Sequence, residues 1–178
     1  MQDVYFASTD TIATTIIWAV TALIKNPSVL KKVQAELRAL PTLQNKPMVE
    51  EEDIATARLP YFNAVIKEAA VFQRGKDPEL WEKPFEFMPE RFLGDERKLS
   101  LDLKGTDFGL IPFGAGRRGC PGITMALATV EIAMANLLYQ FDWGLPDGMK
   151  KEDIDSDILP GMAMHKKNPL LLMAKKFV

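Results

Sequence analysis

The residues with the clearest capacity for chemistry are Cys120, the only cysteine among 178 residues, and the glycines and arginines beside it. Gly116, Arg118 and Gly122 flank this thiol. Glycine has no side chain that would keep a large flat ligand away from the backbone. An apolar segment that predicts a helix, Ile123 to Tyr139, follows directly, so the thiol stands at a helix N-terminus beside positive charge. This environment favours the thiolate, which is the metal-binding form of cysteine.

The residues around Cys120 allow more than one interpretation. An isolated cysteine is more often a small structural residue than a ligand. A zinc site is disfavoured, because Cys120 and the single histidine, His165, cannot provide the four usual ligands. Arg118 offers a planar, permanently charged group suited to a carboxylate, and Phe113 supplies an aromatic wall. The composition of the loop alone therefore leaves open a structural thiol or a single metal-binding thiolate.

The complete decapeptide from Phe113 to Gly122 resembles the cysteine signature of the haem-thiolate monooxygenases, the cytochrome P-450 superfamily. The resemblance implies that Cys120 is the axial thiolate ligand of haem iron. It further implies that the fixed positions of the signature bind haem, with Arg118 on a haem propionate. These cofactor-binding positions are Phe113, Gly116, Arg118, Cys120 and Gly122.

Asp10 and Thr11 lie in a segment that resembles the oxygen-activating part of the long central helix of the superfamily. The resemblance implies that these two residues relay protons during catalysis. The Thr11 hydroxyl is also expected to bond to the carbonyl of Ala7, one helical turn earlier. Ser8 departs from the pattern, which has glycine there. A face of small residues with threonine also fits simple close packing of helices, and this interpretation stays open.

Glu68 stands where the Glu-x-x-Arg helix of the superfamily begins, and Arg91 belongs to a Pro-Glu-Arg-Phe element that also matches. In the superfamily the glutamate forms a structural network with two arginines. Here the position three residues after Glu68 carries Val71, so one arginine is absent. Two interpretations remain: Glu68 pairs with Arg91, or Glu68 is a solvated charge on a helix.

The resemblance covers residues 1–178 as the C-terminal portion of the fold, and we expect a single partial domain. Its ending, 159–168, is similar to plant microsomal members. After Val71 the superfamily continues through strands that this sequence lacks, which indicates an internal deletion from a skipped exon or a faulty gene model. The expected fold class is mainly α, the C-terminal part of the cytochrome P-450 fold with a small C-terminal β-hairpin.

Hydrophobic periodicity predicts four helices. They begin near Gln2, Pro27, Pro60 and Ile123. Asn26 is expected to cap the second helix, and the first helix should end just before it. The fourth helix has few polar residues, so we expect it to be buried nearly all round. Residues 74–112 predict ordered loops, and 161–175 predict a terminal hairpin.

The composition excludes several classes of protein. A hydrophobic fraction of 47% with 26% charged residues is typical of a globular protein, and a net charge of −2 gives no reason to expect nucleic acid. A single cysteine excludes a disulfide framework. The segment from Val4 to Ile24 is about long enough to span a bilayer, but Asp10 and six hydroxyl groups favour a buried protein helix. We therefore expect no transmembrane segment.

The resemblance implies a monooxygenase that inserts one atom of dioxygen into a small organic substrate in plant secondary metabolism. It implies haem as the cofactor and a flavin-containing reductase as the electron donor, so that NADPH acts only indirectly. It also implies the surface of the endoplasmic reticulum membrane, or the cytoplasm if the expected absence of an anchor holds. The alternative is an inactive truncated remnant or splice product that acts at most as a haem-binding or protein-interaction module.

Overall fold

The computed structural model describes residues 2–44, 46–74, 79, 81–94, 112–161 and 163–177. The chain is mainly helical with two small antiparallel strand pairs, which confirms the expected fold class. The α-helices are α1 (Gln2–Lys25), α2 (Pro27–Arg38), α3 (Glu51–Thr56), α4 (Pro60–Arg74) and α6 (Ile123–Gln140). The strands are β1 (Phe141–Gly144), β2 (Ile158–Leu159), β3 (His165–Lys166) and β4 (Met173–Lys176). Short 3-10 turns are η1 (Pro41–Leu43), η2 (Pro89–Phe92), η3 (Gly116–Arg118) and η4 (Lys151–Asp153).

The junction between α1 and α2 lies where the sequence predicts it. The first helix ends at Lys25, and the second begins at Pro27, whose missing N–H costs nothing at a helix start. Asn26 occupies the N-cap position of α2, but its side chain donates from Nδ2 to the carbonyl of Ala22 at 2.8 Å. The expected side-chain cap of α2 is therefore wrong, because Asn26 satisfies a carbonyl at the end of α1 instead.

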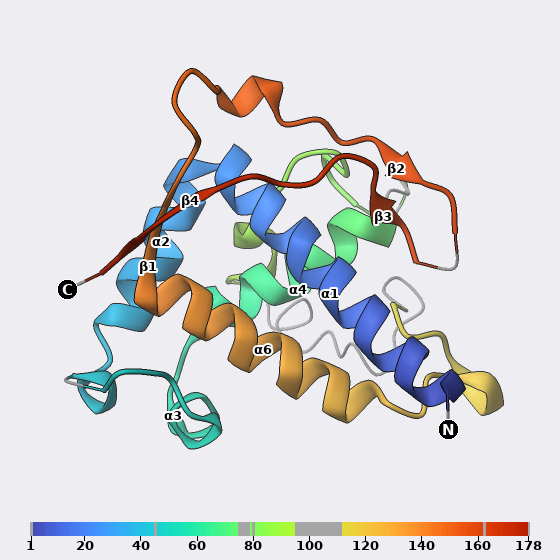
Figure 1. The fold of residues 1–178 in the computed structure, drawn as a ribbon. Helices are drawn as coiled ribbons and strands as arrows, with labels where there is room; N and C mark the ends of the chain where they lie inside the picture. Colours follow the sequence, from blue (N-terminus) through green and yellow to red (C-terminus); the bar gives the residue numbers. More distant parts are fainter. Residues whose placement is uncertain are drawn as a thin grey trace.

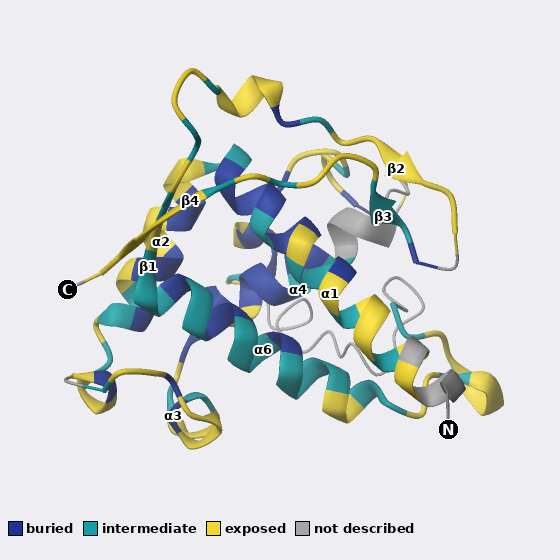
Figure 2. Ribbon diagram, viewed as in Figure 1, coloured by how far each residue is buried: buried dark blue, intermediate teal, exposed yellow. Residues whose placement is uncertain are grey.

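The main hydrophobic core lies where α1, α2, α4 and α6 meet (Figure 1). Each of these helices contributes a side chain with 0% exposure, and these are Leu23, Val33, Phe62 and Met134. Burial of one such side chain stabilises the fold by about 1.5–3 kcal/mol relative to leaving it in water. Figure 2 shows this burial concentrated in the C-terminal parts of α1 and α6.

The N-terminal halves of α1 and α6 are much more open than their C-terminal halves (Figure 2). Ala7, Thr11 and Ala13 are exposed on α1, and Met125 on α6 is 57% exposed. The buried residues of α6 begin only at Val130. The expectation that this helix is buried nearly all round is therefore wrong, because the described elements cover its first half only in part.

Two helices are long and apolar enough to cross a membrane, as judged by length and composition: Ala7–Lys25 within α1, and α6. Of the tested part of α1, 44% is buried inside the protein, against 22% for α6. In α1 the buried residues include Trp18, Ala19 and Leu23. This packing of α1 is typical of a core helix in a globular protein.

Both strand pairs involve the C-terminal part of the chain. The short β2 pairs with β3, and β1, which directly follows α6, pairs with β4. A small C-terminal hairpin is therefore present in β2 and β3, but residues 161–175 do not form one by themselves. β4 pairs instead with β1, which follows α6. The alternation of apolar and polar residues within 161–175 carries no information about a strand so distant in the sequence.

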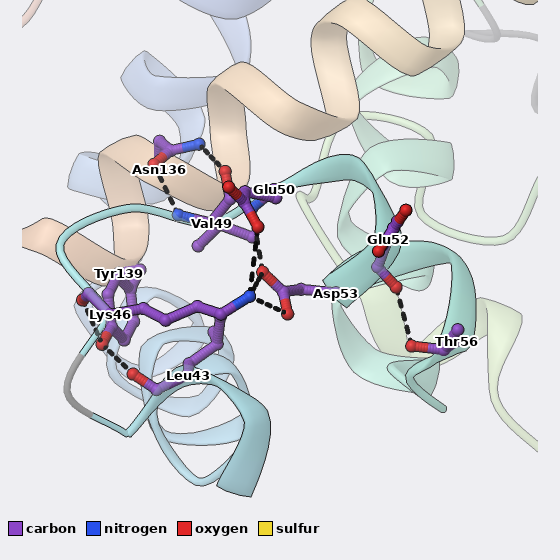
Figure 3. A network of polar contacts seen from close by, with 9 residues as sticks. All are labelled: Leu43, Lys46, Val49, Glu50, Glu52, Asp53, Thr56, Asn136 and Tyr139. Carbon is purple, nitrogen blue, oxygen red and sulfur yellow. Dashed lines mark hydrogen bonds and ion pairs between the residues drawn. The ribbon is translucent and has the colours of Figure 1, made fainter.

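The C-terminal half of α6 is also held by polar contacts to the segment that leads into α3 (Figure 3). The Asn136 amide forms a closed pair of hydrogen bonds with Val49: Oδ1 accepts from the Val49 N–H, and Nδ2 donates to the Val49 carbonyl, each at 2.9 Å. The Tyr139 hydroxyl donates to the carbonyl of Leu43 at 2.6 Å. These contacts tie the C-terminal half of α6 to the segment before α3 and set which face of the helix is turned toward it.

Replacement of Asn136 by leucine is expected to lower the free energy of unfolding by about 1–3 kcal/mol. The reason is that both backbone groups of Val49, which is 1% exposed, lose their partner in a buried setting. Urea unfolding followed by circular dichroism measures the change. Asn63→Leu, at an exposed position of α4, is the matched control and should change stability little. Equal effects at the two positions would contradict the role given to Asn136.

Candidate functional site

The thiol of Cys120 is exposed at the end of a tight loop that leads into α6. The loop is closed by a hydrogen bond in which the Cys120 N–H donates to the carbonyl of Phe113 at 2.9 Å. Gly114 and Gly116 have φ values of 71° and 72°, in the left-handed region that residues with a Cβ rarely adopt. These two positions therefore require glycine for the loop to hold the thiol outward.

The residues around Cys120 are open to solvent and include two arginines. A side chain at Gly122 would bring its Cβ to 4.0 Å from Sγ, so glycine leaves that side of the sulfur free. Arg117 and Arg118 are both exposed in the turn before Cys120. The positive end of the 18-residue helix α6 begins directly after Gly122. The loop therefore places two exposed arginines before Cys120 and a helix N-terminus after it.

Phe113 anchors the start of this loop on the rest of the protein. Its half-buried ring packs against a second hydrophobic cluster. This cluster consists of Ala64 of α4, Phe92 of η2, and Trp81 in the loop between them. The rings of Trp81 and Phe92 lie 5.8 Å apart at 52° to one another. Leu127 of α6 packs against the same cluster. Both ends of the cysteine loop are therefore fixed to one set of aromatic side chains.

Glu68 and Arg91 form a buried ion pair beside this cluster. Their side chains are 1% and 4% exposed, and Arg91 Nε lies 2.7 Å from Oε2 of Glu68. The N–H does not point at the oxygen, so neither atom makes a hydrogen bond within the described part of the chain. Oε1 of Glu68 accepts from the Met88 N–H at 2.9 Å. The interpretation of Glu68 as a solvated helix charge is therefore wrong.

The guanidinium of Arg91 also organises the loop that carries Trp81. Its two terminal nitrogens donate to three backbone carbonyls within 2.6–3.2 Å, namely those of Glu82, Lys83 and Glu86. The guanidinium carbon lies 5.9 Å from the centre of the Trp81 ring. Arg91 thereby links α4, through Glu68, to the loop that supports Phe113.

Burial raises the pKa of Glu68 above its ordinary value of 4.5, and the Met88 N–H and Arg91 lower it only in part. Folding therefore favours the protonated carboxyl, so the stabilising contribution of Glu68 is full below about pH 4.5 and is lost as the pH rises through the raised pKa. Within the described residues, Arg91 is the arginine paired with Glu68, and it offsets the effect of burial only in part.

The variant Glu68→Gln carries a permanent mimic of the protonated form. We expect its free energy of unfolding, relative to the unmodified protein, to rise as the pH is raised from about 4 to about 8, because only the carboxyl loses its favourable form. Urea unfolding at several pH values measures this difference. A difference that falls with pH would mean that pairing with Arg91 outweighs the cost of burial.

Asp10 and Thr11 contact different parts of the protein. The Thr11 hydroxyl donates to the Ala7 carbonyl at 2.6 Å, as the helical spacing predicts. Oδ2 of Asp10 lies 3.0 Å from Nε2 of His165 in β3, a partner that the sequence did not indicate. The one feature of the sequence that could have singled out His165 is that it is the only histidine of the chain.

The donor set at the cysteine loop fits haem better than a bare metal ion. In the described ranges, no group of three or more His, Cys, Asp or Glu residues could hold a metal ion. A single exposed thiol suits a metal that brings its other ligands with it, as iron in a porphyrin does. Ala7 and Thr11 are exposed on the open half of α1, and the glycines beside Cys120 carry no side chain that would keep a flat group away.

Comparison with known proteins gives a consistent result. The sequence model of the family Cytochrome P-450 matches residues 1–70 and 69–173. Cytochrome P-450 71A1 of Persea americana is 40% identical over 98% of this chain and 40% of its own length. Tryptamine 5-hydroxylase of Oryza sativa subsp. japonica is 37% identical over 98% of this chain and 39% of its own length. The chain spans about two fifths of the length of the curated relatives that it matches.

The matches also locate a missing stretch inside the chain. With 6,7,8-trihydroxycoumarin synthase of Pastinaca sativa, 37% identical over 100% of this chain and 42% of its own length, 217 aligned positions cover the 178 residues, so about 39 positions of the relative have no counterpart. The two family segments meet inside α4, next to the Val71 at which the sequence predicts the deletion. Because both segments match in order, and the second contains the glycine loop that exposes the thiol of Cys120, this chain belongs to the cytochrome P-450 family.

Proposed function

We propose that this chain is the haem-binding portion of a monooxygenase that inserts one atom of dioxygen into a small organic substrate. The observation that carries the proposal is the exposed thiol of Cys120, held just before α6 and just after two exposed arginines. Family membership supports haem as the cofactor. Two of the relatives are a tryptamine 5-hydroxylase and a 6,7,8-trihydroxycoumarin synthase, and these names support oxidation of a small organic molecule.

In this proposal Cys120 binds iron through Sγ, and Arg118 holds a carboxylate of the same group. Gly116 and Gly122 leave the space that the flat group needs, and Phe113 fixes the loop to the core. When bound, haem supplies the activation of dioxygen at its iron. The protein contributes the charge, the shape and the partial exclusion of water around that position.

On the facing helix, Asp10 and Thr11 are the proposed proton carriers. The carboxylate of Asp10 is exposed enough to exchange protons with solvent, and the Thr11 hydroxyl lies on the neighbouring face of α1. Ser8, which departs from the family pattern, bonds through Oγ to the Tyr5 carbonyl at 3.1 Å. This bond keeps its hydroxyl against its own helix, which limits the effect of the departure.

The proposed electron donor is a flavin-containing NADPH reductase that docks on the cysteine side. The exposed Arg117 and Arg118 offer that face positive charge for an acidic partner. The proposed location is the surface of the endoplasmic reticulum membrane, where such a reductase and an apolar substrate meet.

Reconstitution with hemin tests the proposal. After reduction and addition of carbon monoxide, we expect the strongly red-shifted Soret band that a thiolate ligand produces. The variant His165→Gln, which removes the only imidazole, should give the same band. A band at the position typical of nitrogen ligation, lost in this variant, would overturn the proposal.

A second candidate function is haem binding without turnover. Two features favour it: the first half of α6 is largely open, and Val71 stands where the family pattern has the second arginine. Both weaken the protein packing around the proposed haem site. Dioxygen consumption with NADPH and a reductase separates the two functions. A thiolate band with consumption no faster than that of the reductase alone would establish the second.

A further inference from the structure

His165 forms a hydrogen-bonded chain with two residues of α1 that lie one helical turn apart. Its Nε2 lies 3.0 Å from Oδ2 of Asp10, and its Nδ1 lies 3.0 Å from Oγ1 of Thr14. A carboxylate can only accept, so the proton of a neutral imidazole sits on Nε2, and the Thr14 hydroxyl donates to Nδ1. The two contacts together define both the plane and the tautomer of the ring.

Thr14 behaves differently from the other threonines of α1. The hydroxyls of the other four donate to the carbonyl one turn earlier on the same helix; they are Thr9, Thr11, Thr15 and Thr21. The recorded bond of Thr14 goes instead to His165, and Thr14 is buried. Its side chain therefore forgoes the usual helix bond for a contact that orients the imidazole.

The backbone around His165 is held on α1 independently of this chain of hydrogen bonds. The Trp18 indole N–H donates to the Met164 carbonyl at 2.6 Å. Lys166, whose side chain is 3% exposed, pairs with Asp155 at 2.9 Å. β3 is paired with β2. The imidazole is thus presented to Asp10 from a fixed strand rather than from a free loop.

We propose that His165 is a positioning residue for Asp10: with Nδ1 anchored on Thr14, its Nε2 holds the Asp10 carboxylate in one orientation beside Thr11. The inference rests on the proposed function, in which Asp10 supplies protons on the oxygen side. Without this contact, a carboxylate that is 51% exposed would rotate among its staggered positions. With it, one oxygen stays on the imidazole and the other remains available.

Nuclear magnetic resonance on the labelled 178-residue chain tests the inference without haem. Because His165 is the only histidine, its ring nitrogens are assigned without ambiguity. We expect the Nε2–H tautomer and a single χ1 rotamer for Asp10, read from three-bond couplings. In His165→Phe the single rotamer should be lost, and in His165→Gln, whose amide can donate from nearly the same place, it should be retained.

Thr14→Val is the second variant, and it keeps the test decisive if His165→Phe does not fold. It removes only the Nδ1 anchor, so Asp10 should lose part of its rotamer preference. Thr9→Val, in which the lost hydroxyl bonds only within α1, is the matched control and should leave Asp10 unchanged. Melting temperatures report any general loss of structure separately.

The outcomes for this inference and for the proposed function are distinct. An averaged Asp10 in the unmodified protein, or an Asp10 rotamer that is unchanged in both His165→Phe and Thr14→Val, would overturn the positioning role even if haem binds through Cys120. A missing thiolate band would overturn the proposed function, whereas a retained Asp10–His165 contact would still establish the positioning contact itself.

Discussion

Cys120→Ser is expected to abolish the thiolate-type Soret band of the ferrous carbon monoxide complex completely. A serine hydroxyl is far less acidic than a thiol and gives no thiolate-like donation to iron. The fold should be unaffected, because the side chain is exposed and substitutions at such positions usually change stability within about 0.5 kcal/mol. Difference spectra after hemin reconstitution measure the loss, and far-ultraviolet circular dichroism confirms the fold.

Arg117→Gln is the matched control for this variant. It changes a neighbouring exposed residue of the same loop and removes a charge without touching the sulfur. The band should persist with at most weaker haem binding. If Cys120→Ser keeps the red-shifted band, the iron ligand lies elsewhere and the cysteine loop has a structural role.

Arg91→Leu is expected to destabilise the protein by about 3–5 kcal/mol, because it leaves the Glu68 carboxylate buried without its counter-charge. Three backbone carbonyls lose their donor at the same time. Since these carbonyls belong to the loop around Trp81, which supports Phe113, haem uptake should fall as well. Urea unfolding measures the first effect and hemin titration the second.

The double variant Glu68→Leu with Arg91→Leu sharpens this prediction. Removal of both charges should cost less than removal of Arg91 alone, since an uncompensated buried carboxylate is the main penalty. Arg58→Leu, at an exposed position, is the control and should be nearly neutral. A double variant less stable than Arg91→Leu would show that the uncompensated carboxylate is not the main penalty.

Four of the five described α-helices and the cysteine loop could be predicted from the sequence because their signals are local, whereas the short α3 was not expected. Pro27 and Pro60 mark helix starts, and the glycines before Cys120 mark a loop with left-handed backbone. A resemblance to a long signature supplied the family. The burial of the helices was harder to predict. The apolar sequence of α6 predicts a core helix, whereas its first half is largely open in the fold.

Contacts between distant segments could not be predicted. Asp10 and His165 stand at opposite ends of the sequence, and nothing in either segment specifies the other. The pairing of β4 with β1 could not be predicted for the same reason, since neither segment specifies the other. For Glu68 the sequence offered two interpretations, and only the fold, which brings Arg91 and the Met88 N–H to it, decides that it is buried and paired.

The pairing of β1 with β4 has a consequence for synthesis on the ribosome. β1 leaves the exit tunnel together with α6, but its partner strand is translated later, after β2 and β3. The nascent chain therefore carries an unpaired strand edge and the apolar surface of α6 until β4 emerges, and such surfaces attract chaperones or other chains. Slow translation across this interval should lower the yield of soluble protein more than a pause before α6.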